Sequence, residues 1–239
     1  MISTLQKLAG IGTNTVPSPH PTINFNSNLP INVEVLKKLD TLRYRLKIGR
    51  KELTTKSQKP LHEGEHYWGN FSGGEGGILT LSNLTRQPLL FQHLSYFLEI
   101  PLHDILQPET FSMASFKSLL VQMLSNEALS KDAFNALSFI LLALNHDVVH
   151  LPLHQEAKRT LLQFKAYEEG YRFYAAFENL GPIEGTITHN GISIAAQYDK
   201  SLYFLDKVVS KLDKIRGLTL QHTIQPLFDA KELSLDLKG

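Results

Sequence analysis

Residues 179–212 read NLGPIEGTITHNGISIAAQYDKSLYFLDKVVSKL and contain two short strands, a tight turn and an amphipathic helix. Apolar and polar residues alternate over 183–188 and again over 192–198, on either side of His189-Asn190-Gly191. Asn-Gly between alternating runs predicts a β-hairpin, because both turn positions need positive φ. A helix follows and ends at Gly217, a residue typical of a C-cap. Its predicted apolar stripe consists of Leu202, Leu205, Val208, Val209, Leu212 and Ile215.

The segments on both sides of this unit also have the period of a strand. In residues 162–166, Leu162 and Phe164 alternate with Gln163 and Lys165, and residues 171–177 alternate in the same way after a turn at YEEGY. Residues 218–224 supply a last strand. Residues 151–239 are therefore predicted to form a β-β-β-β-α-β unit, a mostly antiparallel sheet with one packed helix.

The first half of the chain has a second group of strands. In residues 42–48, four apolar side chains including Leu42 and Tyr44 face one way, and Arg43, Arg45 and Lys47 face the other. Further strands are expected through Leu53, through Tyr67-Trp68, and over 78–81. Several short strands at this spacing predict a small antiparallel β-barrel over residues 32–87.

The pattern between the two groups of strands is helical. Apolar residues recur at helical spacing in 88–150 and predict a connector of about three helices, the last with Ser130 as N-cap. Residues 11–31 lack periodicity and are rich in Pro, Asn, Ser and Thr, which predicts a disordered lead over residues 1–31. The expected fold class is α+β, in the order lead, barrel, helical connector and C-terminal sheet.

Composition narrows the function classes. The 239 residues carry a net charge of +1, so no global field draws the chain to nucleic acid or to a membrane. The absence of cysteine excludes disulfides and thiolate chemistry and fits a reducing cytoplasm. No segment approaches the roughly 20 apolar residues that span a bilayer, and the N-terminus does not have the pattern of a signal peptide.

Three motifs suggest chemistry, and each has a simpler interpretation. His146, His150 and His154 are spaced like metal ligands, but Pro152 and two β-branched residues favour a helix end passing into a strand. SGGEGG at 72–77 has no Lys-Ser/Thr pair after it, so a hairpin tip is favoured over a phosphate loop. No G-x-S-x-G elbow occurs, and Glu168-Glu169 lie in a turn. We therefore assign no catalytic residue, metal or cofactor.

The C-terminal ninety residues resemble the C-terminal domain of flagellar hook-length control proteins. The resemblance rests on LPL at 151–153, the Leu180-Gly181 step, PIEGTITHNGISIAAQY, and the helix SLYFLDKVVSKLDKIRGL. Phe177 stands where the family has a proline, and Pro182 follows the glycine instead. IGRKELTTKSQKPLHEGEHYWGNF is also similar to an N-terminal segment of some members. The chain is too short for the long ruler segment that is typical of this family.

The resemblance implies a non-enzymatic assembly factor that acts in hook-length control or in switching export specificity. Its expected partners are the cytoplasmic domain of the export-gate switch protein of the type III secretion apparatus and other flagellar assembly proteins. The expected location is the cytoplasm, and export through the flagellum stays open. Lysines outnumber acids on the predicted helix and would form a basic rim for an acidic partner, although an ordinary solvated helix face gives the same pattern. The candidate partner-binding residues are Leu180, Gly181, Pro182, Lys200, Lys207, Lys211 and Lys214.

An alternative hypothesis is a single-stranded nucleic-acid-binding module built on the N-terminal strands. The basic residues Arg43, Arg45 and Lys47 lie near Tyr44, Tyr67, Trp68 and Phe71 in the sequence. Tyr44, however, is expected on the face opposite the arginines, and a stacking platform should share the face of the charges. Binding that weakens steeply with salt would support this hypothesis.

Overall fold

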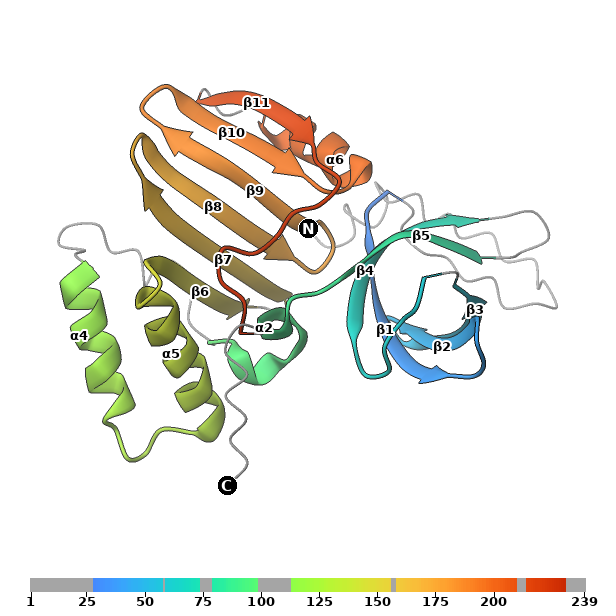
Figure 1. Cartoon of the computed structure of the whole chain (residues 1–239), viewed down its shortest axis with the longest axis horizontal. Coiled ribbons are helices and arrows are strands. Elements are labelled where there is room, and N and C mark those ends of the chain that lie inside the picture. The colour runs from blue at the N-terminus through green and yellow to red at the C-terminus, as the bar shows by residue number, and fades with distance from the viewer. Residues whose placement is uncertain are drawn as a thin grey trace, which may run out of the picture.

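The computed structural model describes residues 28–57, 59–73, 79–98, 113–155, 158–209 and 214–230. The fold is α+β, with two mostly antiparallel sheets and few helices in this part of the chain (Figure 1). Residues 1–27 of the predicted lead lie outside the described residues. The two sheets lie side by side. Two helices, Met113–Leu124 and Lys131–Leu144, lie beside the edge strand Val148–Gln155 of the larger sheet.

The first sheet has five strands in the order β3-β2-β1-β4-β5, all antiparallel. No ladder joins β3 to β5 among the described residues, so the predicted barrel is an open sheet. Leu53 of β3 and Leu81 of β5 both pack against the buried core of this sheet, although no ladder joins their strands. Trp68 of β4 packs with Phe91 and Tyr198 of the neighbouring region. The strands are β1 (Ile31–Lys38), β2 (Arg43–Ile48), β3 (Lys51–Lys56), β4 (His66–Gly73) and β5 (Leu79–Arg86).

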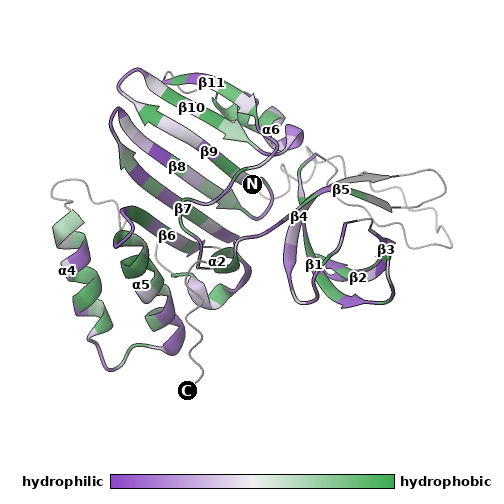
Figure 2. Ribbon diagram, viewed as in Figure 1, coloured by the Kyte–Doolittle hydropathy of each residue, from purple (hydrophilic) through white to green (hydrophobic). Residues whose placement is uncertain are grey.

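Strict alternation builds the core of this sheet. Tyr44, Leu46 and Ile48 are buried and the residues between them are exposed, as predicted. Strand β1 was not predicted, although Ile31, Val33 and Val35 alternate inward along it. Figure 2 shows this alternation along the strands. Leu42 is an exception: the pattern places it inside, but it lies in the β1–β2 turn, exposed.

The second sheet has six strands in the order β11-β10-β9-β8-β7-β6, one strand more than predicted. All pairs are antiparallel except β10–β11, which are parallel and are connected through α6 (Asp199–Val209). Ile215 and Gly217 belong to β11, so the predicted helix is too long and Gly217 is not its C-cap. The open edge of β10 gives these residues a ladder, and tertiary pairing overrides the local helical pattern. The strands are β6 (Val148–Gln155), β7 (Lys158–Tyr167), β8 (Gly170–Phe177), β9 (Gly181–Thr188), β10 (Gly191–Ala196) and β11 (Ile215–Leu220).

The predicted hairpin at His189-Asn190-Gly191 is present, with His189 and Asn190 in the turn and Gly191 paired with Thr188. Its backbone differs from the prediction. Positive φ falls on Gly191, at 133°, whereas among the described non-glycine residues only Asn83 and Asp147 have positive φ. An Asn-Gly turn requires positive φ at both residues, and here Gly191 has it while Asn190 does not.

The face of the six-stranded sheet that carries Gln163, Tyr174 and Ala176 is buried. Residues 221–230 cross this face, as the red segment in Figure 1 shows. On the opposite face Leu162, Phe164 and Phe173 are only half-buried. Alternation alone assigns Gln163 to the polar side, so the structure buries the side that the pattern marks as polar.

Gln163 holds the crossing segment in place. Its Oε1 accepts hydrogen bonds from the backbone N–H groups of Leu227 (2.8 Å) and Phe228 (3.1 Å), and its Nε2 donates to the Phe228 carbonyl (2.8 Å). The same Nε2 lies 3.0 Å from Nδ1 of His150. Burial lowers the pKa of His150 to about 3, so the ring is neutral and Nδ1 accepts.

The helical part is shorter than predicted at its start. Instead of a first helix, α2 (Leu89–Gln92) is followed by the single turn η2 (Leu94–Tyr96). The other two predicted helices are present as α4 (Met113–Leu124) and α5 (Lys131–Leu144), and the Ser130 hydroxyl caps α5 by accepting from the Ala133 N–H. In the described residues, no helix has the length and apolar character needed to cross a membrane.

Candidate functional site

The Leu180-Gly181-Pro182 step lies at the junction of the two sheets. Gly181 has φ of +69°, and a Cβ at this position would lie 2.7 Å from Cε2 of Tyr198. The Leu180 carbonyl accepts from the Ser201 hydroxyl at 2.6 Å, which ties the first turn of α6 to this step. Gly181 and Pro182 are buried. Glycine is required here by both its backbone conformation and the close approach of the Tyr198 ring.

An aromatic cluster fills this junction. The rings of Trp68 and Phe91 are 5.1 Å apart, and Phe97, Tyr174 and Tyr198 belong to the same buried group. The Tyr198 hydroxyl donates to the Asn83 carbonyl of β5 at 3.1 Å, and burial raises the pKa of Tyr198 to about 12. Gly181 and Pro182 are therefore covered within the fold, and their contact with a partner stays a prediction.

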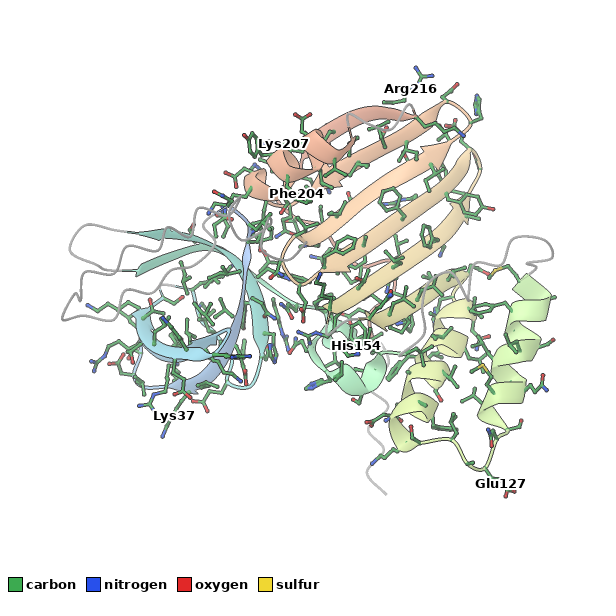
Figure 3. The ribbon with its side chains drawn as sticks, turned by 180° about the vertical axis from the view of Figure 1, so that it is seen from behind. Lys37, Glu127, His154, Phe204, Lys207 and Arg216 are labelled. Carbon is green, nitrogen blue, oxygen red and sulfur yellow. The ribbon has the colours of Figure 1, made fainter. Side chains whose placement is uncertain are left out.

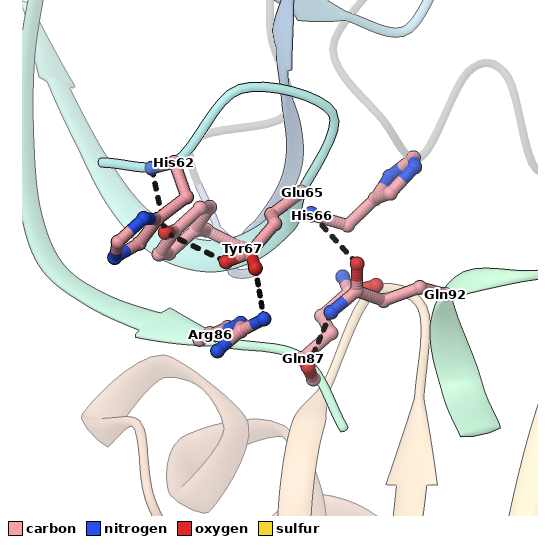
Figure 4. Close-up of polar contacts among 7 residues, drawn as sticks. All are labelled: His62, Glu65, His66, Tyr67, Arg86, Gln87 and Gln92. Carbon is pink, nitrogen blue, oxygen red and sulfur yellow. Dashed lines mark hydrogen bonds and ion pairs between the residues drawn. The ribbon is translucent and has the colours of Figure 1, made fainter. Parts of the chain in front are cut away.

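A polar network borders the aromatic cluster where β4 and β5 meet α2 (Figure 4). Glu65 forms an ion pair with Arg86 and accepts from the Tyr67 hydroxyl at 3.2 Å. Gln92 accepts from the His66 N–H at 3.4 Å and donates to the Gln87 carbonyl at 2.7 Å. These bonds join β4 and β5 to α2, while Nδ1 of His66 and Oε1 of Gln87 are buried without a hydrogen-bond partner among the described residues.

Arg159 of β7 fastens α2 to the six-stranded sheet. Its guanidinium donates to the carbonyls of Phe91 (3.0 Å) and Gln92 (2.9 Å) and pairs with Glu178 at 2.7 Å. The carbonyls at the end of a helix need such donors, and a cation there also suits the helix dipole. The charge of Arg159 is thus occupied within the fold.

The predicted basic rim is divided between two elements. Lys207 lies on α6, with its Nζ 4.0 Å from the ring centroid of Tyr203. Lys200 is half-buried in the first turn of α6, and Lys211 lies outside the described residues. Lys214 precedes β11 and is not on the helix, and Arg216 of β11 donates to the Asn190 carbonyl. Figure 3 shows Lys207 and Arg216 well apart.

The outer side of α6 exposes large apolar side chains. Tyr203 is 64% exposed and Phe204 42% exposed, and Val208 is also exposed one turn further along. We call Tyr203, Phe204, Lys207 and Val208 the α6 surface; Figure 3 labels Phe204 and Lys207 on it. Sequence reasoning placed Val208 in the buried stripe and overlooked the two aromatic residues. The signal was present, because LYFLDKVV is apolar around most of the helix, more than one covering sheet can bury.

A cavity of about 480 Å³ opens between the first sheet and the β8–β9 turn. Its lining includes Glu34, Lys47, His66 and Glu178. Glu34 and Lys47 form an ion pair at 3.1 Å, and burial lowers the pKa of His66. The charged groups therefore largely compensate one another, and the cavity presents no cluster of unpaired groups of one sign.

The histidines of the sequence motif do not meet. His146 is exposed in the α5–β6 turn, His150 is fully buried in β6, and His154 lies further along the same strand. The predicted passage from helix to strand at this point is confirmed. Among the described residues, no group of three His, Cys, Asp or Glu side chains is placed to hold a metal ion.

The nucleic-acid hypothesis depends on aromatic residues beside the basic strand. Tyr44, Tyr67 and Trp68 are buried, with Tyr44 and Tyr67 in the core of the first sheet, and the side chain of Phe71 lies outside the described part. Buried rings cannot stack on bases, so the three described rings give no platform on the basic face.

The chain matches no family model, no curated protein and no solved structure.

Proposed function

We propose that this chain is a non-enzymatic flagellar assembly factor that acts in hook-length control or in switching export specificity. Its partner is the cytoplasmic domain of the export-gate switch protein, and the contact is made by the α6 surface. The resemblance described above, carried by the hairpin and the helix of residues 180–217, supports the flagellar assignment. The place of action is the cytoplasmic side of the export apparatus, without a cofactor.

The exposed aromatic residues of the α6 surface carry this proposal. Two neighbouring aromatic side chains and a lysine on one helix have the composition of an interface hot spot, in which a few buried aromatic anchors supply most of the binding energy. In the free protein, the exposed side chains of Tyr203 and Phe204 keep apolar surface in contact with water, which is unfavourable. A partner that covers them recovers this free energy, and Lys207, stacked against Tyr203, adds a charge at the rim.

The test is a binding titration between the full chain and the purified cytoplasmic domain of the switch protein. We expect Phe204→Ala to weaken the complex about tenfold or more, the usual effect of truncating an aromatic anchor. Phe134→Ala is the matched control, because Phe134 is 48% exposed on the separate helix α5. No complex with the unmodified chain would refute the partner. Equal effects of the two variants would refute the α6 surface as the contact.

A deletion strain supplies an independent readout. A flagellar assembly factor of this kind should leave cells with hooks of abnormal length and impaired motility when it is removed. Normal hooks and normal swimming in the deletion strain would contradict the proposed function as a whole.

A further inference from the structure

The β1–β2 hairpin carries two exposed leucines at its tip. Leu39 is 40% exposed and Leu42 is 49% exposed, and Lys38 and Arg43 flank them in the sequence. The sequence pattern predicts Leu42 in the core. Its exposure results from its position in the turn between β1 and β2. Two leucines in water at the tip of a hairpin have no packing role in the described fold.

Asp40 fixes the shape of this tip. Its Oδ1 accepts from the backbone N–H groups of Leu42 (3.0 Å) and Arg43 (2.8 Å), and its Oδ2 pairs with the Arg43 guanidinium. These bonds hold the pKa of Asp40 at about 2, so the carboxylate stays ionised and engaged. Asp40 thus holds the turn that presents the leucines, and next to it the carboxylate of Glu63 accepts from the Lys38 N–H at 2.7 Å.

A basic face lies behind the tip. Lys37 is directly opposite Arg45 across the β1–β2 ladder, and Arg43 is directly opposite Lys56 across the β2–β3 ladder. Like charges in direct cross-strand pairs destabilise a sheet. Lys37, Arg45 and Lys56 are exposed, and none has an acidic side chain within ion-pair distance among the described residues. From residue 31 to residue 60, basic residues outnumber acidic ones nine to three.

Contact with an anionic surface reduces the repulsion between these basic side chains. The exposed leucines indicate which kind of anionic surface fits. Single-stranded nucleic acid needs exposed rings to stack on its bases, and Tyr44 is buried beneath the basic face. A phosphate backbone or an acidic peptide compensates the lysines but gives leucines no apolar environment. Figure 3 shows Lys37 on the side of the first sheet that points away from the six-stranded sheet, so the tip is accessible to a plane.

We propose that the β1–β2 hairpin docks this chain on an anionic lipid surface. Leu39 and Leu42 enter the boundary between head groups and acyl chains, while Lys37, Arg45 and Lys56 contact the head groups. Apolar tip residues ringed by basic side chains match the two attractions of such a surface, apolar burial and electrostatic attraction to anionic lipid. The inference rests on the first sheet alone and is independent of the α6 surface and of the proposed partner.

The test is co-sedimentation of the full chain with vesicles of phosphatidylcholine containing 30% phosphatidylglycerol, and with vesicles of phosphatidylcholine alone. We expect binding to the anionic vesicles only, weakening as salt increases. Leu39→Ser with Leu42→Ser should abolish most of it. Lys37→Gln with Arg45→Gln should weaken it by roughly twenty-five-fold, at about fivefold for each basic residue near a membrane.

Leu119→Ser is the matched control, because Leu119 is 51% exposed on the distant helix α4 and its variant should bind like the unmodified chain. All substituted residues are exposed, so the variants should fold, which circular dichroism checks. Equal binding to neutral vesicles would overturn the proposal, and so would full binding by the leucine pair. Binding to a single-stranded oligonucleotide or an acidic peptide that is unchanged in the leucine pair, without binding to vesicles, would assign the face to that polyanion instead.

Discussion

The two sheets bury their interiors by different means. The first sheet is packed almost entirely with apolar side chains, among them Val33, Val35 and Leu46, which have no exposed surface. The six-stranded sheet buries Gln163 and His150 against residues 221–230. That segment crosses the sheet without a ladder for most of its length, so its backbone N–H and C=O groups need other partners. Side-chain amides supply these bonds, Gln163 at Leu227 and Phe228 and Gln197 at Ile224.

We call the hydrogen bonds from Gln163 to Leu227 and Phe228 the polar clamp. The comparison predicts that its removal causes the largest loss of stability. Gln163→Leu leaves the N–H groups of Leu227 and Phe228 and the Phe228 carbonyl without their partners. At 1–3 kcal/mol for each unsatisfied group, partly offset by water, we expect a loss of about 4 kcal/mol in the free energy of unfolding. Urea denaturation measures this loss, and limited proteolysis should show earlier cleavage after residue 220. Gln122→Leu is the control, because Gln122 is exposed on α4; similar losses for both variants would refute the clamp.

A truncation in the apolar core of the first sheet should cost somewhat less. Leu46→Ala removes a fully buried side chain and should lower the free energy of unfolding by about 3 kcal/mol, the sum of lost burial and of a cavity. Leu42→Ala, in the same hairpin but exposed, should change it by less than about 0.5 kcal/mol. Chemical denaturation measures the free energy of unfolding of both variants. A large loss for Leu42→Ala would show that the hairpin tip is packed in solution.

Acid should weaken the six-stranded sheet before the first sheet. The pKa of His150 is about 3 in the folded chain and near 6.5 when unfolded, so only the unfolded chain gains this proton between those values. The contribution of His150 is therefore complete above pH 6.5 and is lost as the pH falls, at up to roughly 1.4 kcal/mol per pH unit. Burial also lowers the pKa of His66, but His66 lies on β4, so this loss falls on the first sheet and reduces the difference between the two sheets.

Hydrogen exchange at pH 7 and pH 5.5 measures this difference. We expect β6 and β7 to lose protection by about 1 kcal/mol more than β1 and β2 do. His150→Asn should be less stable at neutral pH, because a buried ring is lost, but its further loss on acidification should be smaller. The same pH dependence in the variant would show that another group is responsible.

The sequence predicted strand β2, where one face is apolar and the other charged, and missed β1, although Ile31, Val33 and Val35 alternate inward along it. Residues 43–48 behave as the pattern indicates, because Arg43, Arg45 and Lys47 cannot be buried unpaired. At residues 162–166 the pattern misleads, because an amide can be buried once its hydrogen bonds are met and periodicity carries no information about the crossing segment 221–230. The hairpin at 189–190 was predictable because its signal is local. The strand order and the meeting of Trp68 with Tyr198 depend on contacts distant in sequence.

The candidate sites show the same contrast between signals that are local in the sequence and features that depend on the fold. The basic outer face of the first sheet was visible in the sequence, since Arg43, Arg45 and Lys47 recur at a period of two. The exposure of Phe204 was not, because helical periodicity shows an apolar stripe but not how much of it the sheet covers. Gly181 was singled out as part of the Leu180-Gly181 step of the family resemblance. Its role at the junction depends on Tyr198, which only the fold brings beside it.

The smallest expected effect concerns the outer face of the first sheet, where charge works against stability. Lys37→Gln removes one member of the Lys37–Arg45 cross-strand pair, so it should raise the free energy of unfolding by about 0.5 kcal/mol at low salt. The gain should disappear in 1 M salt, where charges are screened beyond about 3 Å. Lys47→Gln is the control, because Lys47 is paired with Glu34 and its loss should bring no gain. If Lys37→Gln destabilises the chain at low salt, the basic face is compensated in the free protein, and the repulsion that would drive it toward an anionic surface does not exist.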